Sequence, residues 1–202
     1  MSKNSFFIFV FAASVIFCSA PPSLAQHRDY MTEPEIELVR DSQDIDKRIE
    51  VLTKMIDRRF SALGLAVGGW KQGDKDQKLW GDAPTGTPSN FLSDVRQLLQ
   101  KAVDDVEDVA AHNENTLTQN KIEGVLFPSA VRSLAAAASR YQPALKSILD
   151  KTKDERDKGL ILTSMELCQE ITDAVAKLPA ETKEEEKKRT KEEQKNKKKG
   201  KT

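Results

Sequence analysis

The side chains that most often bind metals or act as nucleophiles are scarce in this chain. It has two histidines, His27 and His112, and two cysteines, of which Cys168 is the one outside the apolar N-terminal segment. Asp108, four residues before His112, is the one acid at helical spacing from a histidine, whereas a zinc site needs three or four converging ligands. The Cys-x-x-Cys-His pattern of haem attachment is absent. We therefore predict no metal centre and no cofactor.

Nucleophilic catalysis has equally little support. Cys168 falls within an apolar stripe at helical spacing, where a thiol acts as a small hydrophobic side chain and its pKa tends to rise. No Gly-x-Ser-x-Gly turn is present. The C-terminal Gly200-Lys201-Thr202 lacks the first glycine of a phosphate-binding loop, because residue 195 is lysine. We therefore expect no catalytic residue and no enzymatic activity.

Four apolar side chains are candidates for contact with a partner. Trp70 and Trp80, the two tryptophans of the chain, fall in a stretch rich in glycine and proline. Tryptophan is enriched at binding hot spots, so they either form a contact surface or seal one end of the folded domain. Leu162 and Met165 lie opposite the main apolar stripe of the last predicted helix. Either two neighbouring helices cover them or they face a partner.

The C-terminal segment 181–202 is a candidate for binding polyanions. It holds ten basic and six acidic residues, or +4, whereas residues 26–180 hold 21 basic and 26 acidic residues, or −5. It contains no apolar residue, so we expect it to be disordered. Flexible basic segments bind anionic surfaces by releasing counterions, and the alternative is a role in solubility alone. The candidate contacts are Lys195, Lys197, Lys198, Lys199 and Lys201; no aromatic side chain is interleaved, so we predict no specific nucleic-acid binding.

The element that organises the rest is a helix predicted at about residues 43–63. Its apolar residues recur at steps of three and four, which places them within roughly 80° of one another on a helix. They are Ile45, Ile49, Leu52, Ile56, Phe60 and Leu63. The residues predicted to face solvent on the opposite side are Lys47, Arg48, Glu50, Lys54, Asp57 and Arg58. Because a single apolar stripe needs partners to cover it, this helix should pack against others.

Three further apolar stripes predict helices at about 90–111, 128–150 and 154–178. Asn90 is the expected cap of the first, and Pro128 suits the start of the second. Pro143 should interrupt that second helix, yet its stripe keeps phase, which favours one kinked helix over two separate ones. We therefore predict an all-α fold, an antiparallel bundle of four main helices with a long loop between the first two, because helices joined by short turns normally lie side by side.

A short helix is expected before the bundle. Thr32 and Glu35 form a capping-box pattern, and the helical phase breaks between about residues 41 and 44. We predict a helix near 33–41 followed by a turn, with one continuous helix as the alternative. The stretch 64–90 reads as a loop of about 25 residues, which is long for a compact domain and therefore either functional or disordered.

The first 25 residues have the pattern of a secretory signal peptide. Lys3 precedes an apolar run from residue 6 to residue 20, which is shorter than the roughly 20 residues that span a bilayer. Small residues at Ser23 and Ala25 predict cleavage between Ala25 and Gln26, and an uncleaved anchor is the alternative. We therefore expect an exported protein, periplasmic or secreted, with no transmembrane segment in the mature chain. The expected organisation is a signal peptide at 1–25, a helical domain at 26–180 and a charged tail at 181–202.

Three short runs resemble segments of uncharacterised exported all-α proteins of soil bacteria. They are Asp44-Ile45-Asp46-Lys47-Arg48-Ile49, Tyr141-Gln142-Pro143 and Asp154-Glu155-Arg156. The resemblance covers about half of the mature chain and implies a bacterial, exported, helical protein. It implies no activity and no site residue.

These observations favour a non-catalytic exported protein that acts through protein–protein interaction. The alternative is a protein whose amphipathic helices bind lipid or an envelope surface, opening on contact. The first hypothesis places function at the tryptophan-bearing loop or at the exposed face of the last helix. The second predicts a gain of helicity on anionic vesicles.

Overall fold

The structure is a computed structural model that describes residues 28–73, 76–112, 126–178 and 187. The described residues are all-helical, without strands. The helices are α1 (Glu33–Asp41), α2 (Ile45–Ala62), α3 (Gln77–Trp80), α4 (Pro88–His112), α5 (Leu126–Leu149) and α6 (Glu155–Ala174), followed by a 3₁₀ turn at Val175–Lys177. The predicted signal peptide, the connection at 113–125 and all the candidate tail lysines lie outside the described residues.

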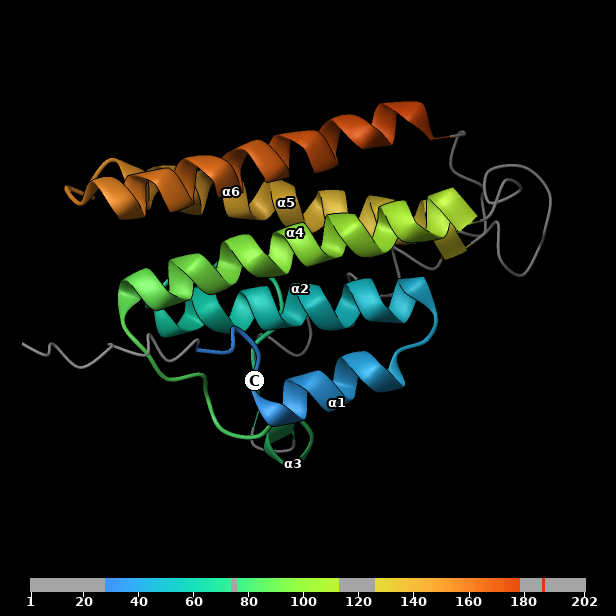
Figure 1. Ribbon diagram of the computed structural model, residues 1–202, viewed down its shortest axis with the longest axis horizontal. Helices are drawn as coiled ribbons and strands as arrows, with labels where there is room; N and C mark the ends of the chain where they lie inside the picture. Colours follow the sequence, from blue (N-terminus) through green and yellow to red (C-terminus); the bar gives the residue numbers. More distant parts are fainter. Residues whose placement is uncertain (1–27, 74–75, 113–125, 179–186, 188–202) are drawn as a thin grey trace, which may run out of the picture.

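Each of the four long helices packs mainly against two others, and α4 and α5 also touch each other. Helix α2 packs against α4 and α5, and α6 packs against the same two helices from the other side. Successive long helices run in opposite directions along a common axis, so that α2 and α5 point the same way, as do α4 and α6 (Figure 1). Helices α1 and α3 lie together on the side of α2 that faces away from α5 and α6 (Figure 1).

The break between the first two helices is confirmed. Helix α1 ends at Asp41 and α2 begins at Ile45, with Asp44 in extended conformation before it. The Ser42 hydroxyl donates to the Leu38 carbonyl at 2.8 Å, and Arg48 Nε donates to the Ser42 carbonyl at 2.9 Å. These two bonds satisfy carbonyl groups that the end of a helix leaves free, and so they stabilise the turn.

Two predicted features of the 64–90 loop are wrong in detail. The short helix α3 lies within it, and α4 starts at Pro88, two residues before the expected cap. The cap is Thr87: its hydroxyl accepts from Asn90 N at 3.2 Å, and its own N–H donates to Asn90 Oδ1 at 2.9 Å. Asn90 thus takes the place that Glu or Gln holds in a capping box, while Pro88 fills the first helical position.

Helix α5 is continuous through Pro143, as the unbroken phase of its apolar stripe predicts. Its small residues Ala130, Ala137 and Ala138 are buried, which lets neighbouring helices approach closely. Tyr141 is fully buried on the same helix and stacks on Phe60 of α2, with ring centroids 5.2 Å apart. The buried apolar side chains of the long helices form one continuous core, which also contains Cys168.

The solvent face predicted for α2 is wrong at its C-terminal end. Asp57 and Arg58 are buried, although both lie opposite the apolar stripe. Every residue from Met55 to Phe60 is buried. Six consecutive residues point in all directions around a helix. This half of α2 is therefore covered on every side, by α4 and α5 on the apolar face and by α1 and the loop on the polar face.

Candidate functional site

The buried polar face of α2 carries a network of charged side chains. At its centre the Glu35 carboxylate of α1 is fully buried and meets two arginines of α2. Arg59 Nη2 donates to Glu35 Oε2 at 2.7 Å, and Arg59 Nη1 bonds the second oxygen. Arg58 Nη1 donates to Glu35 Oε1 at 2.5 Å. A carboxylate held by two guanidinium groups is the strong, charge-assisted form of hydrogen bond.

The same carboxylate also belongs to the capping box predicted for α1. The Thr32 backbone N–H donates to Glu35 Oε2 at 2.9 Å. Burial alone would raise the pKa of Glu35, but the hydrogen bond and charge of Arg59, the Thr32 N–H and the charge of Arg58 together hold the pKa below its ordinary value. Glu35 is therefore ionised at neutral pH despite its burial.

A second carboxylate, Asp94 of α4, extends the network to another helix. It is 1% exposed and pairs with Arg28, whose two Nη atoms lie 2.7 and 2.8 Å from the two carboxylate oxygens. The hydrogen bond from Arg28 to Asp94 raises the pKa of the arginine. Arg59 Nε lies 3.4 Å from Asp94 Oδ2, so Arg59 joins Glu35 to Asp94. The network therefore connects the N-terminal segment, α1, α2 and α4.

Both tryptophans pack beside these arginines. Arg58 lies over the Trp80 ring, 5.6 Å from its centroid, and also donates to the Asp82 carbonyl. The Trp70 and Trp80 ring centroids are 5.0 Å apart, and Lys54 Nζ lies 5.9 Å from the Trp70 centroid. Cations over aromatic faces attract the ring quadrupole. The loop that carries the tryptophans is thus held against α2 by the arginine that also binds α1.

Asp57 fixes the start of the loop from the other side of α2. Its Oδ2 accepts from the Trp70 backbone N–H at 2.8 Å, and its Oδ1 lies 3.0 Å from the Tyr141 hydroxyl and 3.8 Å from Arg140 Nη2. Burial raises the pKa of Asp57, and these three partners offset only part of the effect. Burial together with the nearby Asp57 charge raises the pKa of Tyr141 well above its ordinary value.

Gly69 passes against the Asp57 carboxylate without room for a side chain. A Cβ built on Gly69 would lie 2.0 Å from Asp57 Oδ2 and 2.6 Å from its Cγ, so one of the two must move. We expect Gly69→Ala to displace the loop and to shift tryptophan emission to the red. Because a clash of this kind typically costs about 1–3 kcal/mol, thermal unfolding should also occur at lower temperature.

The matched control is Gly159→Ala, since a Cβ at that helical glycine meets nothing within 4 Å. Alanine is favoured over glycine inside a helix by about 1 kcal/mol, so this variant should be slightly stabilised and keep wild-type emission. Unchanged emission in Gly69→Ala would contradict the docking of the loop on Asp57.

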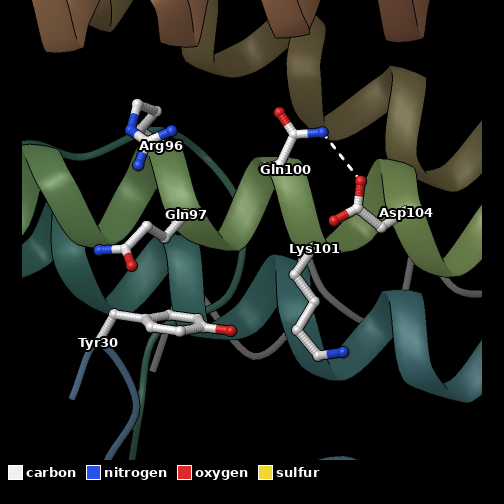
Figure 2. Close-up of a pocket in the computed structure, with 6 residues that line it drawn as sticks. All are labelled: Tyr30, Arg96, Gln97, Gln100, Lys101 and Asp104. Carbon is white, nitrogen blue, oxygen red and sulfur yellow. Dashed lines mark hydrogen bonds between the residues drawn. The ribbon is translucent and has the colours of Figure 1, made fainter.

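A surface hollow lies beside the network, on the exposed side of α4. Its volume is about 270 Å³, and it is lined by Tyr30, Arg96, Gln97, Gln100, Lys101 and Asp104. Figure 2 shows that Arg96 points away from Tyr30, while Gln100 bonds Asp104 at 2.9 Å. Lys101 forms an ion pair with Asp105 at 3.1 Å. Gln97 bonds Ser93, so Gln100 and Asp104 are the two lining residues that bond each other.

The carboxylates of the network are buried and lie apart from the surface hollow. They lie among arginines and the Tyr141 hydroxyl inside the protein, and the hollow is lined by none of them. Across the described ranges, no three His, Cys, Asp or Glu side chains are grouped to hold a metal ion. Burial raises the pKa of the Cys168 thiol to about 12, so it stays protonated at neutral pH.

The structure separates the candidate contact residues. Trp80 is 3% exposed beneath Arg58, and Trp70 is half-buried beside it. On α6, Leu162 is 48% exposed and Met165 is half-buried, three residues further along the same face. The structure therefore brings the tryptophans together with the charge network, while Leu162 and Met165 belong to a separate helix. The exposed neighbour of Trp80 is Leu79 of α3.

Sequence reasoning missed the charges that hold this site together. Glu35 was identified as a capping residue, which explains one of its bonds but not its arginine partners. Asp94 offered a signal, because it lies between the apolar residues Leu92 and Val95 that are also buried. The adjacent pair Arg58-Arg59 offered a second signal. When a helix of this length lies at the centre of a fold, at least one of two adjacent arginines must contact a neighbouring element.

Comparison with known proteins identifies no relative of this chain. No protein-family model, no curated protein and no solved structure matches it. None of the helices in the described part of the chain has both the length and the apolar character needed to cross a membrane.

Proposed function

We propose that this chain is a non-catalytic exported protein that acts by binding another protein. In this proposal α2, α4, α5 and α6 serve as an antiparallel bundle, a rigid support that carries contact residues on its surface. The proposed export rests on the signal-peptide pattern, and the resemblance to exported helical proteins of soil bacteria agrees with it.

One observation carries the proposal. Leu162 is 48% exposed on α6, a helix whose opposite face is buried against α4 and α5. Met165, three residues further on, is half-buried and packs against the apolar core, so Leu162 is the exposed member of this pair. A large aliphatic side chain held on a rigid helix gives contact area at little entropic cost, which is the requirement for a protein-binding anchor. Leu79, 57% exposed beside the tryptophan pair, is a second such residue.

The charges near Leu162 are of both signs. Glu166 is exposed one turn after Leu162, whereas Glu155 pairs with Lys158 at 2.7 Å and Arg156 is exposed beside them. The cationic candidates for lipid contact are the tail lysines, which lie beyond α6. We therefore keep lipid binding as the alternative that the experiment must exclude.

The test compares capture of envelope proteins by the full mature chain and by surface variants. We expect Leu162→Ser to lose a partner that the wild type retains, because a polar side chain replaces the apolar anchor. Thr163→Ser, at the neighbouring exposed position, is the matched control and should retain it. Leu79→Ser paired with Lys78→Ser examines the second position in the same way. Identical capture by all variants would contradict both anchors.

Co-sedimentation with anionic phosphatidylglycerol vesicles separates the two hypotheses. The protein-binding proposal predicts no sedimentation of the mature chain with vesicles and no gain of helicity by circular dichroism. Sedimentation that increases helicity would favour the lipid-binding alternative instead.

A further inference from the structure

Helix α1 is attached to the rest of the protein mainly through charge. Its one fully buried residue is Glu35, and the apolar residues Leu38 and Val39 are only partly buried against the core. Glu35 makes its contacts to α2 through Arg58 and Arg59. A nine-residue helix is too short to be stable alone in water, so its order depends on this docking.

The tryptophan-bearing loop is attached to the same side of α2 by polar groups. Its bonds to the helix run from the Trp70 N–H to Asp57 and from Arg58 to the Asp82 carbonyl. Inside the loop, Gln72 Nε2 donates to the Gly81 carbonyl at 2.9 Å. These bonds join the loop to itself and to α2.

Helix α1 and the loop also contact each other directly. Gly81 lies against the Pro34 ring, where an added Cβ would be 2.8 Å from Pro34 Cγ. Gly81 has φ of +63°, which favours glycine independently of the contact. Arg28 joins the N-terminal segment to the loop, because it donates to the Thr85 carbonyl at 3.2 Å, and it also binds Asp94 of α4. The N-terminal segment, α1 and the loop therefore form one contiguous layer over α2.

We propose that residues 28–41, 65–73 and 76–87 form a cap that separates from α2 as a unit when Glu35 loses its charge, while α2, α4, α5 and α6 remain folded. The cap covers the charged half of α2, whereas the apolar half of α2 faces α4 and α5. Loss of the cap therefore exposes charged groups of α2. It also removes Trp80 from the edge of the apolar core, together with partly buried cap residues such as Leu38 and Trp70, while the contacts among the long helices remain. The inference concerns the fold itself and holds whether or not the protein binds the proposed partner.

Protonation of Glu35 removes the one negative charge that Arg58 and Arg59 share at the cap. The charged groups around Glu35 are these two arginines of α2; beyond Arg59 lies Asp94 of α4, which Arg28 of the cap also faces. A neutral Glu35 leaves two buried guanidinium groups, of which Arg59 still lies 3.4 Å from Asp94. Uncompensated buried charge strongly disfavours the docked state.

The direction of the pH effect follows from the two carboxylates that face the cap. Glu35 has a lowered pKa, so its contribution to docking is present above its ordinary pKa and is lost as pH falls through the lower, folded value. Asp57 has a raised pKa and therefore acts in the opposite sense, since its protonation on acidification favours the folded state. Neutral Asp57 can still accept from Trp70, so acid release depends on Glu35.

The first experiment is an acid titration of the full mature chain from pH 7 to pH 2. Both tryptophans of the protein lie in the cap, so their emission reports undocking, while circular dichroism at 222 nm reports the long helices. We expect a red shift of emission at a pH where most of the helical signal persists. Coincident loss of both signals would overturn the proposal.

The second experiment removes the Glu35 charge at neutral pH. Glu35→Gln should show the red-shifted emission at pH 7 and lose helical signal corresponding to at most the nine residues of α1 and the four residues of α3. The matched control is Glu37→Gln, because Glu37 lies on the exposed side of the same helix and pairs only with exposed Arg40. Wild-type emission in Glu35→Gln at pH 7 would overturn the proposal.

A third measurement uses the unmodified protein, so it is valid even if Glu35→Gln fails to fold. Hydrogen exchange at neutral pH, read by mass spectrometry, should show the amides of α1 and of residues 77–82 exchanging at one common rate, faster than those of α4 and α5. A cap that opens only by global unfolding would instead share the protection of α4 and α5, and that result would overturn the proposal.

Discussion

Replacing Arg59 by methionine is expected to lower the free energy of unfolding, followed by tryptophan fluorescence in urea, by about 3–5 kcal/mol. Arg59 is 1% exposed, binds both oxygens of Glu35 and also reaches Asp94 and the Tyr30 carbonyl. Methionine fills similar space but leaves Glu35 and Asp94 with less compensation inside the protein. Removing one partner of a buried ion pair therefore lowers the free energy of unfolding, whatever the net contribution of the intact pair to that free energy.

The control for this prediction is Arg40→Met on α1. Arg40 forms an ion pair with Glu37, but both side chains are more than half exposed. Exposed pairs contribute roughly 0–1 kcal/mol, so the control should differ little from wild type. Equal effects of the Arg59 and Arg40 substitutions would show that burial does not strengthen the network.

The double variant Glu35→Leu with Arg59→Leu tests the origin of the effect. It removes both charges together, and Asp94 keeps its bidentate contact with Arg28. Buried ion pairs replaced by apolar residues of similar volume are often neutral or stabilising. Arg58 still loses its Glu35 partner in the double variant. We therefore expect the double variant to lose less stability than the sum of the two single variants, by a coupling of about 1–3 kcal/mol.

Replacing Tyr141 by alanine is expected to lower the free energy of unfolding by about 3–5 kcal/mol, measured by circular dichroism in urea. The side chain is fully buried, stacks on Phe60 and lies 3.1 Å from the Thr53 carbonyl through its hydroxyl. Alanine opens a cavity between α2 and α5 and leaves Asp57 without its hydroxyl partner. Unlike the substitutions in the cap, this one acts on the packing of the long helices.

Tyr141→Phe separates the ring from the hydroxyl. The ring is kept, so the expected loss is smaller, about 1–3 kcal/mol, from leaving a buried acceptor unpaired. Tyr30→Phe is the matched control, because Tyr30 is the other tyrosine of the chain and is only partly buried. An equal loss in Tyr141→Phe and Tyr141→Ala would mean that packing of the ring contributes nothing.

Tyr141 also predicts how stability depends on alkaline pH. Its pKa is raised well above the ordinary value of about 10, so above that pH the unfolded chain binds fewer protons than the native one. Stability from Tyr141 is therefore present below pH 10 and is lost as pH rises through the higher, folded value. Tyr141→Phe should weaken the alkaline part of the pH dependence.

The helices could be predicted from the sequence because their signals are local. Apolar residues at steps of three and four identified α2, and the unbroken phase of the stripe through Pro143 identified α5 as one helix. The turn between α1 and α2 followed from a break in that phase. Each of these signals depends on residues close in sequence, which is also what determines helix geometry.

The errors came from contacts between distant parts of the chain. Asp57 and Arg58 were placed on a solvent face because one helix, taken alone, has an apolar and a polar side. In the protein the polar side is covered by α1 and the loop, so that Arg58 lies between Glu35 and Trp80. Twenty-three residues separate Glu35 from Arg58 in the sequence, and no local pattern relates them.

The sequence by itself determined that this protein is helical, where most of its helices begin and end, and which residues form the apolar core. Hydrophobic periodicity and capping residues are properties of short segments. They can be recognised without knowing which other segments pack against them. Only the tertiary structure decided that Glu35, Asp57, Arg59 and Asp94 are buried, because burial of a charge depends on the groups that surround it in space. A buried charge is tolerated only where opposite charges meet it, and here those charges come from the N-terminal segment and from α1, α2, α4 and α5.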